Sequence, residues 1–209
     1  MPYDVFFAVT RGAEADTTPF HKRHAMQIPE YFYRIDIHTH TPHPDHEAIV
    51  NITPRQDFGD NQRYSVGIHP WDAAIVTDSD WQRLTAMAAD PRCVAIGECG
   101  LDTKHKSDSD TPTAPLSVQE TIFRRQIQLA ESVAKPLIIH CVGAIDTLLK
   151  IKRDTTPKQP WILHGFRGKP QQAQQLTAHG LILSLGLRHN PAVPGAIPAT
   201  HLLHETDAQ

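Results

Sequence analysis

The sequence predicts an α/β fold, a TIM-like (β/α)8 barrel in which parallel strands alternate with covering helices. Two observations predict it. Short apolar or β-branched runs recur eight times along the chain, and several stretches between them carry the signals that start and stop helices. With 209 residues, 40% of them hydrophobic and 21% charged, the chain is long enough to bury one such core.

The eight predicted strands cover residues 35–40, 48–53, 65–69, 94–98, 137–140, 161–164, 181–185 and 202–207. The connections after the first two strands are short and rich in Pro, Gly and Asp, too short for the usual crossover helix. We therefore expect the first part of the barrel to be poor in helices.

Helices are predicted between several later strands. Residues 79–82 and 117–120 each fit the capping box, in which a hydroxyl and a side chain three residues later satisfy free backbone N–H groups. Two more helices are expected at 144–153 and 170–179, the latter followed by Gly180 as a stop signal. The helix that opens at 117–120 carries a stripe of buried-type residues at helical spacing, namely Phe123, Ile127, Ala130 and Ala134.

Residues 1–33 are expected to be an N-terminal extension and residues 34–209 the barrel. The apolar run at residues 5–9 is far shorter than the roughly 20 residues of a membrane span, and no basic stretch leads a secretory core. We therefore expect a cytoplasmic protein with no membrane partner. We also expect the run at 5–9 to pack over the barrel surface. Nothing in the sequence indicates an oligomeric state.

Composition argues against several classes of function. Three cysteines without a Cys-x-x-Cys pair favour neither a disulfide framework nor a zinc knuckle. Cys93 and Cys99 are expected to be small buried hydrophobes, and Cys141 to point away from any site on the face of its neighbour His140. A formal net charge of −3 argues against a protein held on nucleic acid by bulk charge alone. The 14 histidines direct attention to metal binding.

Five predicted strands have His, Glu or Asp at or near their carboxyl ends, and in a parallel barrel all these ends meet at one mouth. Imidazole and carboxylate without thiolate suit a catalytic divalent ion such as Zn²⁺ or Mn²⁺. Six ligands exceed one tetrahedral site, which points to two metals joined by a shared carboxylate, with water as the nucleophile in phosphoryl or acyl hydrolysis. The predicted ligands are His38, His40, Glu98, His140, His164 and Asp207.

A single histidine at a strand end is more often a hydrogen-bonded structural residue than a ligand. For His201 or His204 alone that reading is favoured. His38 and His40 alternate to the same face of their strand and can grip one ion, although an exposed polar pair would have the same spacing. The metal interpretation rests on all five strand ends together.

These residues, in this order, resemble the TatD-type metal-dependent hydrolases, a deoxyribonuclease-like branch of the amidohydrolase-type barrels. Among the matching motifs, the GECGLD block is highly specific to the family, and the other motifs are individually weaker but occur in the family's order. The matching motifs are IDIHTH at 35–40, GIHP at 67–70, GECGLD at 97–102, KPLIIH at 135–140, HGF at 164–166 followed by Gly168, and ETD at 205–207.

The resemblance implies hydrolysis of DNA phosphodiester bonds, often from a 3′ end, with two divalent ions, Zn²⁺, Mn²⁺ or Mg²⁺. It implies that His38, His40 and Asp207 bind one metal, that His140 and His164 bind the other, and that Glu98 joins them. Asp207 and Glu98 are thus the implied catalytic residues, with Asp207 orienting or deprotonating the water. His69 resembles the family histidine near the substrate phosphate, and Asp102 is expected to fix the loop after Glu98.

The sequence departs from the family pattern in three places, one of which is the N-terminal stretch to about residue 33, which has no recognised counterpart in the family. Val142 stands where the family usually has an arginine, two residues beyond the histidine of the fifth strand. The family normally continues for several tens of residues beyond the position of Gln209, so the barrel is expected to have a truncated C-terminal end.

Local phosphate affinity could come from a basic rim at the mouth, although ordinary solvated loop charge is an equal alternative. Trp71 could line the mouth and stack a base, but such a tryptophan is more often core packing. The predicted rim consists of Lys104, His105, Lys106, Arg167, Lys169, Arg188 and His189.

The leading hypothesis is a two-metal hydrolase acting on DNA or another phosphodiester. One alternative keeps the metal site but acts on a small amide or ester, because this fold supports many chemistries. Another is a metal-binding barrel without catalytic activity. A nucleophilic hydrolase is disfavoured, since no Gly-x-Ser-x-Gly elbow occurs.

Overall fold

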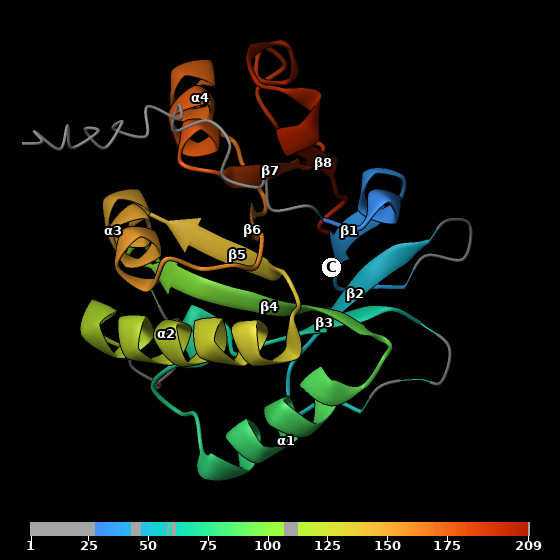
Figure 1. The fold of residues 1–209 in the computed structure, drawn as a ribbon. Helices are drawn as coiled ribbons and strands as arrows, with labels where there is room; N and C mark the ends of the chain where they lie inside the picture. The colour runs from blue at the N-terminus through green and yellow to red at the C-terminus, as the bar shows by residue number, and fades with distance from the viewer. Residues whose placement is uncertain (1–27, 43–46, 58, 60–61, 107–112, 209) are drawn as a thin grey trace, which may run out of the picture.

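Eight parallel strands form the barrel that the sequence predicts (Figure 1). The computed structural model describes residues 28–42, 47–57, 59, 62–106 and 113–208. Each strand pairs with the next one along the chain, in the order β1 to β8. The strands are β1 (Asp36–Thr39), β2 (Ala48–Ile52), β3 (Tyr64–Val66), β4 (Cys93–Asp102), β5 (Leu137–Val142), β6 (Trp161–Leu163), β7 (Leu181–Leu185) and β8 (Leu202–His204).

The barrel nearly closes between β1 and the residues that follow β8. The backbone N–H of Asp207 donates to the carbonyl oxygen of His38 at 3.1 Å, and that of His40 donates to Ala208 at 2.8 Å. These bonds bring the last residues of the chain against the first strand. The backbone of one predicted ligand, Asp207, is therefore bonded directly to that of another, His38.

Helices cover the barrel where the sequence predicts them (Figure 1). After β1, β2 and β7 the described residues form no α-helix, which confirms the helix-poor start; the stretch after β7 holds only the short 3-10 turns η4 (Pro194–Ala196) and η5 (Ala199–His201). The α-helices are α1 (Asp78–Ala89), α2 (Leu116–Val133), α3 (Ile145–Thr155) and α4 (Pro170–Ala178).

The predicted starts of two helices are wrong. Helix α1 is capped by Thr77, whose hydroxyl accepts from the N–H of Asp80, so the capping box lies two residues earlier than residues 79–82. Helix α2 begins directly after Pro115, and residues 117–120 lie inside its first turns. Pro115 is the N-cap residue, with an extended ψ of 150°, and no side chain caps the helix.

The predicted stripe on α2 ends earlier than expected. Phe123, Ile127 and Ala130 are buried. Ala134 instead stops the helix with a left-handed φ of 53° and is exposed. Its position in the stripe was wrong because the chain turns away there, and the backbone N–H of Lys135 bonds to Ala130.

Two strands run further than their predictions, two stop three residues earlier, and β1, β2 and β6 end one residue earlier. β4 continues past Glu98 to Asp102, and β5 continues past His140. β3 ends at Val66 and β8 at His204, so His69 and Asp207 lie in the segments after these strands. The extension of β4 depends on Gly100, because a Cβ there would overlap the carbonyl oxygen of His140 on β5.

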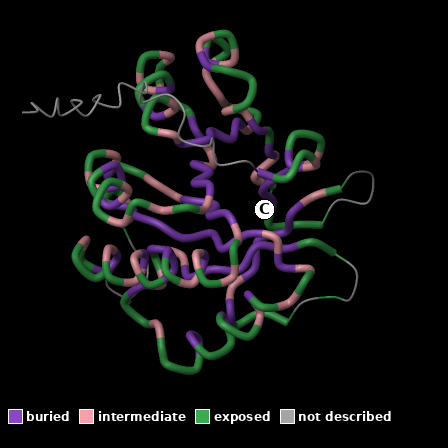
Figure 2. Tube along the Cα trace, in the orientation of Figure 1, coloured by how far each residue is buried: buried purple, intermediate pink, exposed green. Residues whose placement is uncertain are grey.

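Apolar side chains from the strands and from the segment before β1 form a cluster that fills the barrel interior. Phe32, on the short 3-10 helix η2 (Glu30–Tyr33), is completely buried and packs with Ile28 against this interior cluster. Figure 2 shows the strands as the buried centre and the outer faces of the helices as exposed. Residues 5–9 lie outside the described part of the chain. The strands contribute Ile37, Ile49, Ala95, Ile138, Ile162, Ile182 and Leu203.

A second apolar layer lies between strands and helices and includes Phe123, Leu148 and Trp161. Cys93 and Cys99 belong to this layer, which confirms that they are buried hydrophobes. Among the helices described, none is long and apolar enough to cross a membrane.

Candidate metal centre

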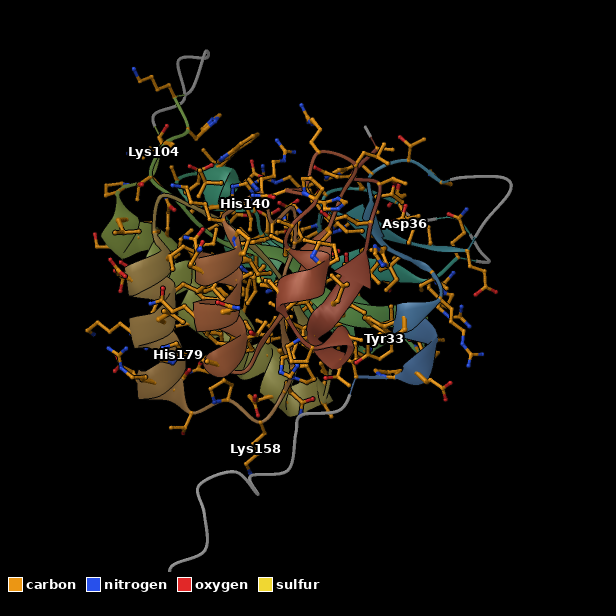
Figure 3. All side chains as sticks on the ribbon, turned by 90° about the horizontal axis from the view of Figure 1, so that it is seen from above. Tyr33, Asp36, Lys104, His140, Lys158 and His179 are labelled. Atoms are coloured by element: carbon orange, nitrogen blue, oxygen red, sulfur yellow. The ribbon has the colours of Figure 1, made fainter. Side chains whose placement is uncertain are left out.

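The carboxyl ends of the strands bring the predicted ligands together at one end of the barrel. Figure 3 shows this end, with Lys104 and His140, opposite the end that holds Tyr33, Lys158 and His179. His38 lies on β1, Glu98 on β4 and His140 on β5. The remaining members, His40, His69, His164 and Asp207, lie in the segments that follow β1, β3, β6 and β8.

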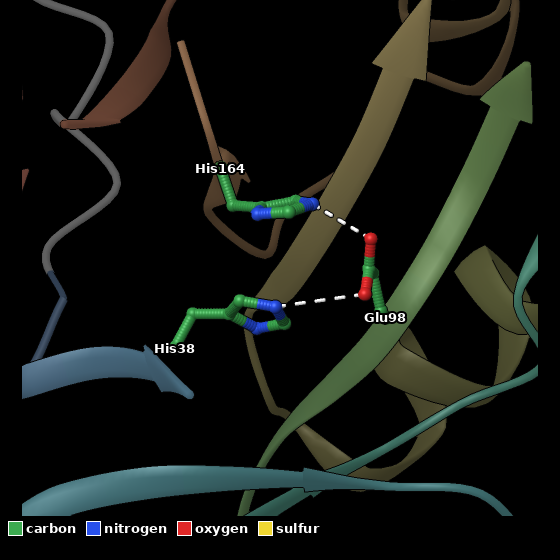
Figure 4. Close-up of side chains that lie close together, drawn as sticks. All are labelled: His38, Glu98 and His164. Carbon is green, nitrogen blue, oxygen red and sulfur yellow. Dashed lines mark hydrogen bonds and ion pairs between the residues drawn. The ribbon is translucent and has the colours of Figure 1, made fainter. Parts of the chain in front are cut away.

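Glu98 is the centre of the cluster, and its two oxygens face different histidines. Oε1 lies 2.9 Å from His140 Nδ1 and 2.7 Å from His164 Nε2. Oε2 lies 3.5 Å from His38 Nε2 and 3.7 Å from His40 Nε2. Figure 4 shows the carboxylate between His164 and His38. A carboxylate placed in this way can bridge two cations.

The His38 side of the cluster has the spacing of a metal site. The Nε2 atoms of His38 and His40 each lie 3.8 Å from Asp207 Oδ1. Two ligands about 2.0–2.1 Å from a tetrahedral metal are roughly 3.3 Å apart, about half an ångström closer than these atoms. On the other side, the contacts of Glu98 with His140 and His164 have hydrogen-bond lengths, so those groups must separate by about half an ångström to admit an ion.

Orphaned polar atoms also indicate that the cluster suits a metal. His38 is completely buried, yet neither of its ring nitrogens has a hydrogen-bond partner among the described residues. A buried polar group without a partner costs free energy, typically about 1–3 kcal/mol. An ion bound to Nε2 would remove this cost, and the donor set of imidazole and carboxylate is the one that Zn²⁺ and Mn²⁺ accept.

The electrostatics of the cluster keep His38 and Glu98 in protonation states that can bind a cation. Burial lowers the pKa of His38 to about 3, so that its imidazole is neutral and able to bind a cation. Burial opposes ionisation of Glu98, but the neighbouring His164 and hydrogen bonds from the histidines outweigh it and hold its pKa well below the ordinary value. For His164 the facing carboxylates outweigh burial and raise its pKa in the absence of a cation.

Three buried side chains that the sequence reasoning did not assign hold the ligating residues in place. Asp36 Oδ1 accepts from the backbone N–H groups of His38 and Thr206, both at 3.1 Å. Asn51 Oδ1 accepts from the N–H of Glu98 at 2.6 Å. Glu205 Oε1 accepts from the N–H of Gly165 at 2.6 Å and lies 3.7 Å from His164 Nδ1.

A signal for two of these residues was present in the motifs. Asp36 and Glu205 each precede a predicted ligand by two residues, in IDIHTH and ETD. Alternation along an extended chain puts such residues on the same face as the ligand. Asn51 had no comparable signal, because it lies at the end of a strand without a motif.

His69 joins the cluster as a hydrogen-bond donor. The backbone N–H of Trp71 donates to His69 Nδ1 at 3.3 Å, which places the proton of the neutral ring on Nε2. Nε2 lies 3.2 Å from Glu98 Oε1. Burial lowers the pKa of His69 despite the raising effect of Glu98, which favours this neutral form.

Asp102 fixes the loop after β4, as expected, and also contacts the site. Its Oδ1 accepts from the backbone N–H groups of Lys104 and His105 at 2.8 and 2.9 Å. Its Oδ2 lies 3.0 Å from His140 Nε2 and accepts from Trp71 Nε1 at 2.9 Å. The Nδ1 lone pair of His140 is therefore directed at the cluster.

Trp71 lies at the mouth and not in the core. Its side chain is 45% exposed, and one ring face is covered by His105, with the ring centroids 3.9 Å apart. A base could stack on this face only after His105 moves.

Two cavities adjoin the cluster. The larger, about 500 Å³, is bounded by His140, His164 and Asp207 and has an apolar wall that includes Val142 and Cys141. The smaller, about 320 Å³, lies beside Asp207 and is lined by Arg167 and Arg188. Of the other predicted rim residues, His105 stacks on Trp71, His189 bonds to the Gly186 carbonyl, and Lys104, Lys106 and Lys169 line neither of these cavities.

Known proteins share both the fold and the sequence pattern. A 3'-5' ssDNA/RNA exonuclease TatD from Cronobacter turicensis is 37% identical over 154 residues, which are 69% of this chain and 56% of the relative. The protein of the same name from Escherichia coli K12 is 33% identical over the same shares. This chain thus spans little more than half the length of the curated relatives that it matches.

Solved structures of two relatives have the same fold. A TatD homologue from Escherichia coli K12 has a TM-score of 0.65 and 24% identity over 84% of this chain and 80% of that one. A TatD family hydrolase from Entamoeba histolytica has a TM-score of 0.67 and 18% identity over 83% and 73%. The family described as TatD related DNase matches residues 30–208. The chain therefore belongs to the TatD-related DNase family.

Proposed function

We propose that this protein hydrolyses phosphodiester bonds in nucleic acid, using two divalent cations that share Glu98. The observation that carries the proposal is the orientation of this buried carboxylate, with one oxygen toward His140 and His164 and the other toward His38 and His40. Asp207 completes the second group. Zn²⁺ and Mn²⁺ suit this histidine-rich set better than Mg²⁺, which prefers oxygen ligands.

Bound cations would lower the pKa of a water molecule and stabilise charge on the phosphate oxygens. Asp207 is placed to accept the proton that this water loses, because Oδ1 faces His38 and His40 while the side chain borders both cavities. The Nε2–H of His69 offers a hydrogen bond to a phosphate oxygen. Asp102 and Glu205 hold the rings of His140 and His164 in position.

The substrate we propose is the end of a single strand of DNA or RNA. The curated relatives are named as 3'-5' ssDNA/RNA exonucleases. A net charge of −3 does not favour tight non-specific binding to duplex DNA, whereas local cations at the mouth attract phosphate without it. The cytoplasmic location expected from the sequence stays a prediction.

Elemental analysis combined with an exonuclease assay tests the proposal. The purified protein is expected to hold about two divalent ions per chain and to degrade single-stranded DNA when Mn²⁺, Zn²⁺ or Mg²⁺ is supplied. Glu98→Gln keeps the shape of the side chain but loses its charge. It should reduce the rate by more than about a hundredfold, the upper end of what loss of an outer-sphere partner costs.

Glu120→Gln, on α2 outside the barrel, is the matched control and should retain the rate of the unmodified protein. Full activity of Glu98→Gln would overturn the two-metal proposal. Metal binding without any phosphodiester cleavage would favour an inactive barrel, and cleavage of amides or esters alone would favour a small-molecule hydrolase.

A further inference from the structure

Two arginines from different loops line the smaller cavity beside the metal centre. Arg167 follows β6 and Arg188 follows β7. Both border the cavity of about 320 Å³, a volume within the range of small ligand sites, roughly 300–1,000 Å³. Residues far apart in the chain thus place two guanidinium groups around one space at the barrel mouth.

The acidic groups of this cavity do not neutralise the arginines. Glu205 is buried and accepts from the N–H of Gly165. Asp207 Oδ1 faces His38 and His40, and its Oδ2 lies 4.0 Å from Arg167, the outer limit of an ion pair. Such a half-exposed pair contributes little. Arg188 has no carboxylate partner among the described residues.

We propose that Arg167 and Arg188 form a subsite for the phosphate group next to the one that is hydrolysed. This subsite rests on the proposed function. The phosphate under attack must lie against His140, His164 and Asp207, which border the larger cavity. Arg188 borders only the smaller one, so it reaches a different phosphate of the same strand. Guanidinium groups bind phosphate through two parallel hydrogen bonds, which suits this role.

Arg167 borders both cavities, as does Asp207. It therefore lies where the strand passes from one phosphate to the next. Arg188 is the more selective probe of the subsite, because it does not touch the metal centre. Lys158 offers a control: it is an exposed cation at the opposite end of the barrel (Figure 3) and lines neither cavity.

The first experiment compares two substrates of the metal-loaded protein. Bis(p-nitrophenyl) phosphate has a single phosphate, whereas a thymidine trinucleotide has a neighbouring one. Arg188→Gln should raise KM for the trinucleotide about tenfold, with a much smaller change for the one-phosphate ester. Arg188→Lys should give an intermediate KM for the trinucleotide, because lysine keeps the positive charge but cannot form two parallel hydrogen bonds with phosphate. Lys158→Gln should leave both KM values as they are.

The second experiment measures binding without turnover. Fluorescence anisotropy of a labelled oligothymidylate, titrated over a range of KCl concentrations in EDTA, gives the salt dependence of the affinity. Arg188→Gln should reduce the slope of log K against log salt by about 0.7, the value for one phosphate contact in a single strand, and Lys158→Gln should not.

The outcomes separate this subsite from the proposed function. If the unmodified protein cleaves neither substrate, the proposed function fails, and the salt slopes still decide the subsite. Equal losses on both substrates would place Arg188 at the scissile phosphate and overturn the proposal. So would an Arg188→Gln variant whose KM and salt slope match those of Lys158→Gln.

Discussion

Asp102 shows how a carboxylate can set the ring tautomer of a proposed ligand, His140, which lies 38 residues away in the sequence. Two backbone N–H groups bond to its Oδ1, while Trp71 Nε1 and His140 Nε2 approach its Oδ2. Four donors thus surround two acceptor atoms. With its Nε2 proton directed at Asp102, the imidazole of His140 offers only the Nδ1 lone pair to a cation.

We predict that Asp102→Asn weakens metal binding by about 10–100-fold. An amide has one acceptor and one donor end. If its oxygen faces the N–H groups of Lys104 and His105, its NH₂ meets His140 Nε2 and shifts the ring proton to Nδ1, the atom a metal needs. Competition with a chelator of known affinity measures the effect.

Trp71→Phe removes one donor but leaves the carboxylate, so it should cost much less affinity and serves as the control. Equal metal affinity in Asp102→Asn and the unmodified protein would show that His140 does not depend on this contact.

At the scale of elements, the start of α1 depends on one buried acid. Asp80 accepts from Thr77 in the capping box and forms two hydrogen bonds with Arg55, at 2.9 and 2.8 Å. The bonds from Arg55 hold the pKa of Asp80 well below its ordinary value. Because the folded-state pKa is lowered, its stabilisation is full above the unfolded pKa of about 3.9 and is lost as the pH falls toward the folded value.

We predict that Asp80→Asn lowers the free energy of unfolding by roughly 1–3 kcal/mol at pH 7. The difference in free energy of unfolding between Asp80→Asn and the unmodified protein should be smaller by about 1 kcal/mol at pH 3, where the carboxyl of the unfolded chain is already protonated. Urea unfolding at the two pH values measures this. Asp78→Asn removes the same charge from the same turn, at an exposed position, and should have little effect. If the difference in free energy of unfolding were the same at pH 7 and pH 3, the charge of Asp80 would not be what stabilises the start of α1.

Element boundaries were the part of the fold that the sequence predicted least well. The hydroxyl at Ser79 fits a capping box as well as the one at Thr77 does, and only the contact of Asp80 with Arg55, 25 residues away, decides between them. The extension of β4 beyond Glu98 likewise depends on Gly100 meeting β5. Such long-range contacts leave no local signal, whereas the apolar period that predicts a strand or helix is local.

At the scale of the whole molecule, the convergence of the candidate site followed from topology alone. Once the strands are parallel and joined in sequence order, their carboxyl ends must share one mouth, whatever the error in each boundary. His69 and Asp207 reached the cluster although β3 and β8 end before them. The buried support Asn51 was missed because it contacts the backbone of a ligand and bears no ligand pattern itself.

The same topology predicts that metal binding holds the barrel closed. One proposed cation would join β1 and the residues after β8 to Glu98 on β4, across the seam and the barrel, while the other would join the neighbouring strands β4, β5 and β6. Metal that binds only the folded chain stabilises it by about 2.7 kcal/mol at a hundred times its Kd. For a chain of this size each kcal/mol raises Tm by about 2–4 °C.

We therefore predict that stripping the metal with a chelator lowers Tm by roughly 5–10 °C, and that adding back Zn²⁺ or Mn²⁺ restores it. Differential scanning fluorimetry on samples of known metal content measures the shift. Glu98→Gln should show a much smaller response, because it lacks the shared carboxylate, while Glu120→Gln should respond as the unmodified protein does. If protein loaded with metal melts at the same temperature as stripped protein, the cations do not connect the strands, and the histidines of the mouth must be held by the fold alone.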